Sequence, residues 1–389
     1  MKDKKNIIQF LPYFPPHKWW LETHADEWGK WWIKKEYWNV YNLITNFDQI
    51  PLSISPQGRE VEQVIYEWTV IWYTKDWVQN LIVPSFEVIS NFPVYKFWTS
   101  KYKLIIKYLK EKETDIVITR TRFFMTSFIW WLFARKNNIK WCHIEHGSDY
   151  VKLKSKLNSI IAYIYDRLIW KWIFTKSDEL VWVSNACKRF INKEFVNRNI
   201  NVVHRWVDII EKEIKKEWEI KLVFVWRLVK LKWVGDLLKA FQNITANIKL
   251  IIIWDWDEKN NLEKIVNEKK LNVEFLWFKD KWFIIDFLYK NKCIMLHPSY
   301  QEWLPSTVID WLLTWNIVVA SDVWWTNEIS EEDDLILFEA WYIEKLVKKI
   351  DFSVKNYDKL VGKSEKLVIN RFSWNENIEK YYKIMRNEK

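Results

Sequence analysis

The stretch His297–Ile329 reads HPSYQEWLPSTVIDWLLTWNIVVASDVWWTNEI and contains the pattern that decides the fold. The apolar run just before it, Cys293–Leu296, has the length and composition of a buried strand. A polar loop follows, then a helix pattern whose start is flanked by Glu302 and Asp310, and then a second buried strand at Val318–Ala320. A strand, a helix and a strand in this order predict two parallel strands joined by a crossover helix.

The same alternation continues along the chain in both directions. Further buried strands are predicted at Ile7–Leu11, Val40–Ile44, Ile116–Thr119, Leu180–Ser184, Asn201–His204, Leu222–Val225, Leu250–Ile253 and Val273–Leu276. Helices are predicted between most of them, for example at Asp236–Gln242 and Leu262–Glu268. Each half contains a strand that leads through a loop into a helix, in FLPYFPPHKWWLE near the start and in FVWRLVKLKWVGDLL from position 224.

This repetition predicts an α/β protein of two open domains, each with a parallel sheet, that face one another across a cleft. A chain of 389 residues exceeds what one hydrophobic core usually serves. We expect the N-terminal domain at 1–208 and the C-terminal domain at 209–373, with the charged stretch Ile209–Ile220 as the linker. A final helix from about Trp374 to Arg386, within 374–389, is expected to return to the N-terminal domain.

Two residue counts are unusual for a soluble globular protein. The chain has 5 glycines, where an average usage of about 7% predicts roughly 27. It has 31 tryptophans, although each buried indole needs space and a partner for its N–H. Either the protein is very rich in tryptophan, or one residue type has been written as another.

The net charge indicates what kind of partner the protein binds, and the cysteine content indicates the redox state of its compartment. The net charge of +10 favours anionic partners such as nucleic acid, acidic lipid or a phosphorylated substrate. Three widely spaced cysteines fit a reducing cytoplasm better than a disulfide framework or a zinc site. The start of the chain indicates a first strand and not a signal peptide. The longest apolar candidate, Leu157–Phe174, is interrupted by charges, so no transmembrane helix is expected.

The sequence resembles the family-four group of retaining glycosyltransferases with the GT-B fold. In the stretch quoted first, the family pattern is matched by Ser299, Glu302, Asp310, Val318, Ala320, Ser321 and Glu328. Tryptophan stands at each position where that pattern has glycine: Trp303, Trp311, Trp315, Trp324 and Trp325. The resemblance extends over nearly the whole chain and implies two Rossmann-like domains.

The same exchange of glycine for tryptophan recurs in the family's other motifs. It falls at Trp19, Trp20, Trp206, Trp226, Trp233, Trp254, Trp256 and Trp277. Random mutation would not select glycine positions in this way, so the pattern indicates a gene in which UGA encodes glycine, translated as if UGA meant tryptophan. Trp374 is expected to be genuine. The alternative is a literal tryptophan-rich protein that binds aromatic ligands or membranes, but a tight phosphate turn needs the conformational freedom of glycine.

The resemblance also implies which residues bind the nucleotide-sugar donor. Arg227 and Lys232 would neutralise the diphosphate, because arginine grips phosphate oxygens bidentately and lysine adds a point charge. Positions 19 and 20, as glycine, would open a helix whose N-terminus binds an anion. Ser306 and Thr307 would add phosphate contacts. Asp310 would bind the ribose hydroxyls, although the family usually has the longer glutamate there.

The catalytic positions implied by the resemblance are His146 and Glu302. His146, in IEHGSD, would lie beside the donor sugar and the attacking hydroxyl, and Glu302 would lie near the donor sugar. Asp255 and Asp257 form an Asp-x-Asp pattern, but they fall in the family's Gly-Asp-Gly turn. No metal and no cofactor are therefore expected.

The resulting hypothesis is a cytoplasmic retaining glycosyltransferase that moves a sugar to a glycan, lipid-linked or other hydroxyl acceptor, in the synthesis of cell-surface polysaccharide or glycolipid. The acceptor would bind mainly to the N-terminal domain and the donor mainly to the C-terminal one. The basic amphipathic stretch from Val151 to Lys176 could contact anionic lipid on the inner face of the membrane; no nucleic-acid partner is expected. Two alternatives stay open: a catalytically silent GT-B subunit that binds nucleotide or acts as a scaffold, and a nucleotide-sugar epimerase.

Overall fold

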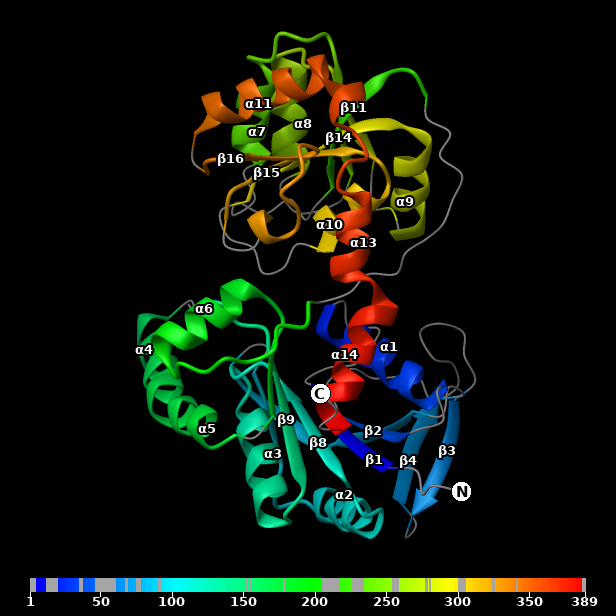
Figure 1. Ribbon diagram of the computed structural model, residues 1–389, viewed down its shortest axis with the longest axis vertical. Helices are drawn as coiled ribbons and strands as arrows, with labels where there is room; N and C mark the ends of the chain where they lie inside the picture. Colours follow the sequence, from blue (N-terminus) through cyan, green and yellow to red (C-terminus); the bar gives the residue numbers. More distant parts are fainter. Residues whose placement is uncertain are drawn as a thin grey trace. The chain divides into compact units, whose positions relative to one another are not determined.

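A computed structural model of the chain describes residues 5–11, 20–34, 38–45, 61–66, 69–74, 78–89, 92–204 except 152, 154 and 178, 217–225, 234–253, 259–276, 279, 281–299, 306–323, 326–340 and 342–386. The chain divides into two compact units (Figure 1). The N-terminal unit comprises Met1–Val183, Cys187–Val202 and Lys383–Lys389. The C-terminal unit comprises Ser184–Ala186 and Val203–Tyr382.

The N-terminal unit contains a sheet in the order β10-β9-β8-β1-β2-β5-β4-β3. Its strands are β1 (Lys5–Leu11), β2 (Trp38–Thr45), β3 (Val61–Tyr66), β4 (Thr69–Thr74), β5 (Gln79–Val83), β8 (Ile116–Arg120), β9 (Lys140–Glu145) and β10 (Glu179–Trp182). The run from β10 to β5 is parallel, whereas β4 and β3 continue it as an antiparallel pair. Counted along the chain, the parallel strands have the order 3-2-1-4-5-6 of a doubly wound dinucleotide-binding sheet.

The C-terminal unit repeats this order in a wholly parallel sheet, β13-β12-β11-β14-β15-β16. Its strands are β11 (Ile220–Val225), β12 (Lys249–Ile253), β13 (Val273–Leu276), β14 (Lys292–His297), β15 (Ile317–Ser321) and β16 (Leu335–Phe338). Both units therefore have the Rossmann-like arrangement, and in each the chain reverses its direction of winding between the first and the fourth parallel strand.

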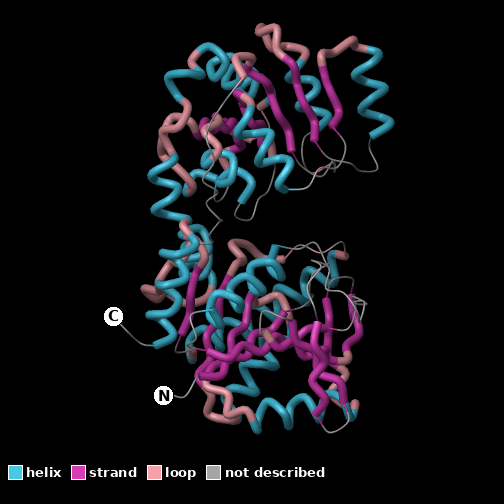
Figure 2. Tube along the Cα trace, turned by 90° about the vertical axis from the view of Figure 1, so that its right-hand side faces the viewer, coloured by secondary structure: helices cyan, strands magenta, loops and turns pink. Residues whose placement is uncertain are grey.

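Helices lie on both faces of the sheets (Figure 2). In the N-terminal unit they are α1 (Trp20–Lys34), α2 (Ser100–Glu111), α3 (Met125–Lys136), α4 (Lys156–Tyr165), the π-helical turn η1 (Asp166–Trp170), α5 (Lys171–Lys176) and α6 (Asn185–Glu194), beside a hairpin of β6 (Ser85–Ile89) and β7 (Phe92–Tyr95). The remaining helices are α7 (Val234–Phe241), α8 (Lys259–Glu268), α9 (Lys281–Lys290), α10 (Ser306–Leu313), the 3-10 turn η3 (Thr326–Glu328), α11 (Ile343–Lys355), α12 (Tyr357–Leu360), α13 (Glu365–Phe372) and α14 (Trp374–Arg386).

The alternation of side chains along each C-terminal strand explains this layering. On β11, Leu222 and Phe224 pack with α7, α8, α11 and α12, whereas Val223 and Val225 pack with α9, α10 and α13. Successive side chains of a strand point to opposite faces. A strand that is apolar at every position therefore requires helices on both sides, which is why the continuous apolar runs predict parallel sheets.

The strand predictions are confirmed with one exception. Asn201–His204 makes only an isolated bridge, from Val202 to Trp182, so the prediction of a strand there is wrong. The strand predicted at Leu180–Ser184 ends at Trp182, because the chain bends at Ser184 into α6. Of the predicted linker, residues 209–216 lie outside the described residues, while Ile220 already belongs to β11.

The final helix has the predicted bounds, Trp374–Arg386. Its last turn belongs to the N-terminal unit, where the Nζ atom of Lys140 donates a hydrogen bond to the backbone oxygen of Met385 at 2.8 Å. Among the helices that the structure describes, none is both long and apolar enough to cross a membrane.

Candidate functional site

The predicted donor-binding segments leave the C-terminal sheet at one place. β11 ends at Val225 and β14 ends at His297, and these two strands are direct neighbours in the sheet. The segments 226–233 and 300–305, which contain Arg227, Lys232 and Glu302, follow these strands and lie outside the described residues. Because ligands of open α/β sheets bind beyond the carboxyl ends of the strands where the winding reverses, both segments begin at the expected ligand-binding edge.

A hydrogen bond between two motif residues connects the ends of β14 and β15 at this edge. The backbone N–H of Ser299, just after β14, donates a hydrogen bond to Oγ of Ser321 at 3.0 Å. Ser321 is the last residue of β15, and both side chains are buried. This bond fixes where the chain leaves β14 before the segment that contains Glu302.

Helix α10 begins at Ser306, directly after that segment. Val308, Ile309 and Leu312 are fully buried in the core below it, so the helix is held firmly against the sheet. Its first backbone N–H groups have no partner within the helix, and the N-terminus of a helix is in general a favourable place for an anion. Thr307 and Asp310 are half-buried on this helix, and Oγ1 of Thr307 has no hydrogen-bond partner within the described part of the chain.

The N-terminal unit presents an equivalent edge. β1 and β8 are neighbours at its switch point, and β1 leads to α1, which begins at Trp20. Trp19 lies outside the described residues. The α1 N-terminus is thus placed after the first strand of the sheet, where the resemblance puts the anion-binding turn.

His146 lies in the loop that follows β9, the strand next to β8. Its side chain is only 3% exposed. The structure therefore places His146 at the carboxyl edge of the N-terminal sheet, one strand away from the switch point. The positions predicted to bind the donor, 227, 232, 302, 306, 307 and 310, belong to the C-terminal unit.

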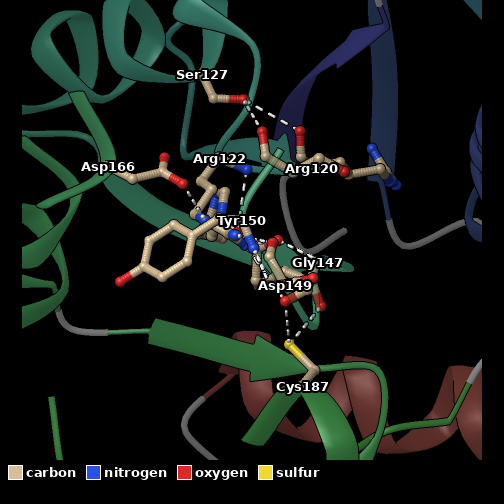
Figure 3. A network of polar contacts seen from close by, with 11 residues as sticks. Arg120, Arg122, Ser127, Gly147, Asp149, Tyr150, Asp166 and Cys187 are labelled. Carbon is tan, nitrogen blue, oxygen red and sulfur yellow. Dashed lines mark hydrogen bonds and ion pairs between the residues drawn. The ribbon is translucent and has the colours of Figure 1, made fainter. Parts of the chain in front are cut away.

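A buried ionic network fixes the backbone on both sides of His146 (Figure 3). Arg122 donates a hydrogen bond from Nη1 to Oε1 of Glu145 at 3.1 Å and another from Nε to Oδ2 of Asp166 at 3.1 Å. The same guanidinium donates to the backbone oxygens of Gly147, at 3.3 Å, and Asp149, at 2.5 Å. All three nitrogens of this buried guanidinium thus donate hydrogen bonds, and the acceptors lie at the end of β9, in the loop that contains His146 and on η1.

Glu145 completes this network from the other side of the loop. It accepts hydrogen bonds from the backbone N–H groups of Arg122, at 3.0 Å, and Gly147, at 2.6 Å. Nε2 of His143 lies 3.1 Å from its second oxygen. A carboxylate with this many donors around it is held in one orientation, and it holds the chain on both sides of His146 in place.

The charges in the network are set by burial and pairing. Burial alone would raise the pKa of Glu145, but Arg122, His143 and the Gly147 N–H lower it to about 2. Burial raises the pKa of Asp166 to about 6 against the opposing effect of Arg122, and burial lowers the pKa of His143. Because the pKa of Glu145 lies below its ordinary 4.5, its stabilising contribution is present above that pH and is lost as the pH falls towards 2.

Two backbone features show how tightly this turn is built. A Cβ on Gly147 would overlap the Arg122 guanidinium and lie 2.9 Å from Oε1 of Glu145, so only glycine fits there. Thr121 has a φ of 63°, a region that a β-branched residue rarely adopts. Its backbone N–H bonds to the Ile144 oxygen at 3.0 Å, and Ser127 Oγ bonds to its oxygen at 3.1 Å. Strain of this kind persists only where the surroundings enforce it.

Arg122, Glu145 and Asp166 are candidate functional-site residues that the sequence did not predict. The available signal was TRTRF directly after a buried strand and a glutamate next to His146. Charged residues at the end of a buried strand indicate either a binding site or a buried pair, and only the structure shows that Arg122 and Glu145 form a pair.

Removing the arginine from this network is expected to destabilise the N-terminal unit strongly. In an Arg122→Ala protein, the carboxylate of Glu145 stays buried without its cation, which costs about 3–5 kcal/mol. The melting temperature of this unit should fall by roughly 10 °C at neutral pH. Calorimetry tests this, with Lys136→Ala on the exposed side of α3 as the matched loss of one positive charge. Equal melting temperatures for the two variants would contradict the assignment.

The comparisons with known proteins agree with this architecture. Residues 208–384 match the family described as Glycosyl transferases group 1, and residues 56–211 match Glycosyltransferase Family 4. An uncharacterized glycosyltransferase of Methanocaldococcus jannaschii is 30% identical, and the alignment covers 98% of each chain. These matches define the class: the chain belongs to the glycosyltransferases.

Solved structures show the same fold. Sucrose-phosphate synthase from Thermosynechococcus elongatus superposes with a TM-score of 0.73 at 13% identity, over 99% of each chain. The Anabaena protein HepE, in complex with UDP and glucose, superposes with a TM-score of 0.68 at 12% identity, over 98% of this chain and 100% of its own. The protein has the GT-B fold of two Rossmann-like domains.

Proposed function

We propose that the protein transfers a sugar from a nucleotide-diphosphate sugar to a hydroxyl acceptor with retention of the anomeric configuration. The observation that carries this proposal is that β11 and β14, the strands that precede the two predicted donor segments, are direct neighbours in the C-terminal sheet. The segments with Arg227 and Glu302 begin where β11 and β14 end, at the switch point of the C-terminal sheet.

The proposed chemistry requires neutralisation of charge at the leaving group. As the bond to the sugar breaks, the diphosphate gains negative charge and the sugar becomes oxocarbenium-like. Arg227, Lys232 and the N–H groups at the start of α10 would stabilise the diphosphate without a metal. Asp310 would accept hydrogen bonds from the ribose hydroxyls, since a carboxylate accepts two at once.

The roles proposed for Glu302 and His146 concern the sugar and the acceptor. Glu302 would contact the donor sugar, and His146 would lie beside the sugar and the attacking hydroxyl. The network of Arg122 and Glu145 supports this assignment, because it fixes the backbone on both sides of His146. The acceptor would be a glycan or a lipid-linked hydroxyl compound in cytoplasmic synthesis of cell-surface polysaccharide or glycolipid.

The product is expected to keep the anomeric configuration of the donor. This expectation comes from the resemblance to retaining enzymes. NMR of the product formed from an α-linked nucleotide sugar should show an α-linkage, and turnover should survive EDTA. A β-linkage would refute retention. A labelled donor recovered as its epimer would favour the epimerase alternative, and donor binding without any transfer would favour the silent subunit.

We also propose that glycine occupies the motif positions written as tryptophan in the functional protein. Trp315 supports this proposal. It has a φ of 52° immediately beyond α10, and its N–H bonds to the oxygen of Leu312. This is the left-handed position at a helix C-terminus that glycine usually occupies. A bulky side chain is an outlier there.

Buried indoles outside the motif positions fit the same exchange of glycine for tryptophan. The Nε1 atoms of Trp28, Trp38, Trp141 and Trp182 are buried and have no hydrogen-bond partner among the described residues. Buried tryptophans normally find an acceptor. Trp130 does, because its Nε1 lies 3.2 Å from the Tyr95 hydroxyl. Buried indole N–H groups without an acceptor are expected if tryptophan stands at positions where the functional protein has a smaller residue.

A further inference from the structure

A row of aliphatic side chains on the N-terminal unit faces solvent instead of the core. It consists of Leu157, Ile160, Ile161, Ile164 and Leu168, and we call it the apolar stripe. These side chains are between 49% and 69% exposed, and α4 has no buried residue. Their spacing of three and four residues places them on one side of the continuous helical run α4–η1.

The helical run continues from η1 through α5, and from η1 onwards one side of it packs on the protein. Asp166 and Trp170 of η1, and Ile173 and Phe174 of α5, are buried. The run therefore differs from an ordinary amphipathic surface helix. One side of it is buried, and the exposed side is also apolar. An exposed apolar patch of this kind on a soluble protein marks an interaction surface.

The charged side chains that this run itself exposes are positive. Lys156, Lys171 and Lys176 are exposed on this run. The sole acidic residue of the segment 151–176 is Asp166, which is buried and paired with Arg122. The outer surface of the run thus combines aliphatic side chains with lysines and no carboxylate. This composition is typical of helices that lie in the plane of an anionic membrane.

We infer that the apolar stripe docks the protein onto an anionic lipid bilayer, with the lysines contacting lipid head groups. A second copy of the chain fits this surface poorly. In a two-fold dimer each patch meets its own copy, so the lysines around the stripe would face like charges. An anionic bilayer matches the aliphatic side chains and the lysines together.

The network below the stripe gives this docking a structural connection to the candidate site. Arg122 bonds to Asp166, on the buried side of η1, and to the oxygen of Gly147, next to His146. The helical run that would lie on the membrane is thus anchored to the loop of His146. Docking would bring that loop to the bilayer, where a lipid-linked acceptor is found. The docking itself does not depend on the proposed transfer reaction.

Vesicle flotation tests the inference with the full-length protein that has glycine at the motif positions. We expect binding to phosphatidylcholine vesicles that contain phosphatidylglycerol and weaker binding to phosphatidylcholine alone. Ile161→Glu combined with Leu168→Glu should lower the partition coefficient by about tenfold or more, since burial of one aliphatic side chain is worth that much. Lys171→Glu with Lys176→Glu should remove the preference for phosphatidylglycerol. Phe352→Glu, an exposed apolar residue of α11, is the matched control and should bind normally.

Nucleotide-sugar binding and circular dichroism, measured without vesicles, should be the same in all these variants, so a failure of docking is distinguishable from a failure of the proposed function. Absence of vesicle binding by the unmodified protein would overturn the inference. So would equal binding by the Ile161→Glu/Leu168→Glu variant. Dimerisation of the unmodified protein in analytical ultracentrifugation, abolished by that variant, would assign the surface to a second copy instead.

Discussion

Replacement of Arg227 by alanine is expected to lower turnover by about 10²–10³ while the fold survives, and replacement of Lys232 should act similarly. The reason is the charge that develops on the departing diphosphate in the transition state. Both residues belong to the segment that leaves β11 at the switch point, where a nucleotide would lie. Because the charge is greatest in the transition state, the loss should appear in kcat as well as in the binding of donor.

The measurement is steady-state transfer with a nucleotide-sugar donor, in the protein with glycine at the motif positions. Lys348→Ala is the matched control, because this lysine is exposed on α11, on the other face of the sheet from α10. It should leave turnover unchanged. Near-normal turnover in Arg227→Ala or Lys232→Ala would remove that residue from the diphosphate site.

The C-terminal parallel sheet could be predicted because the inner parts of its central strands are apolar at every position. Leu222–Val225 and Leu250–Ile253 have no polar face, so each had to be covered on both sides. The repeated order of strand, loop and helix then indicated which edge of each sheet would bind a nucleotide, namely the edge at the carboxyl ends of the strands. The pairing of β11 with β14, the two strands that precede the predicted donor segments, follows from the doubly wound topology that the resemblance implies.

Other features could not be predicted because their signal is weak or nonlocal. The antiparallel pair β3–β4 at the edge of the N-terminal sheet follows no continuous apolar run, since Glu62 and Gln63 interrupt it. The network of Arg122 joins residues 23 and 44 positions apart, and nothing in the local sequence indicates such pairs. Asn201–His204 is apolar enough for a strand, but it meets β10 at a single bridge.

The protein with glycine at the thirteen motif positions is expected to bind nucleotide sugar, and the chain with tryptophan there is not. At Trp226, Trp233, Trp303 and Trp325 the indole would occupy space where backbone must approach a phosphate or a neighbouring strand. Overpacking at one core position costs about 1–3 kcal/mol. A domain typically has only about 5–15 kcal/mol of stability, so a dozen such substitutions exceed it.

Expression of both versions, followed by thermal melting and titration with nucleotide sugars, tests this expectation. The tryptophan version should aggregate or fail to bind. At position 315 the effect should also appear singly: Trp315→Gly in the tryptophan version should raise the melting temperature, because glycine adopts the left-handed conformation without strain. The codons of the gene give an independent result, with UGA expected at 315 and the other motif positions and UGG at 374. Equal binding by both versions, or UGG at the motif positions, would establish that the tryptophans are real.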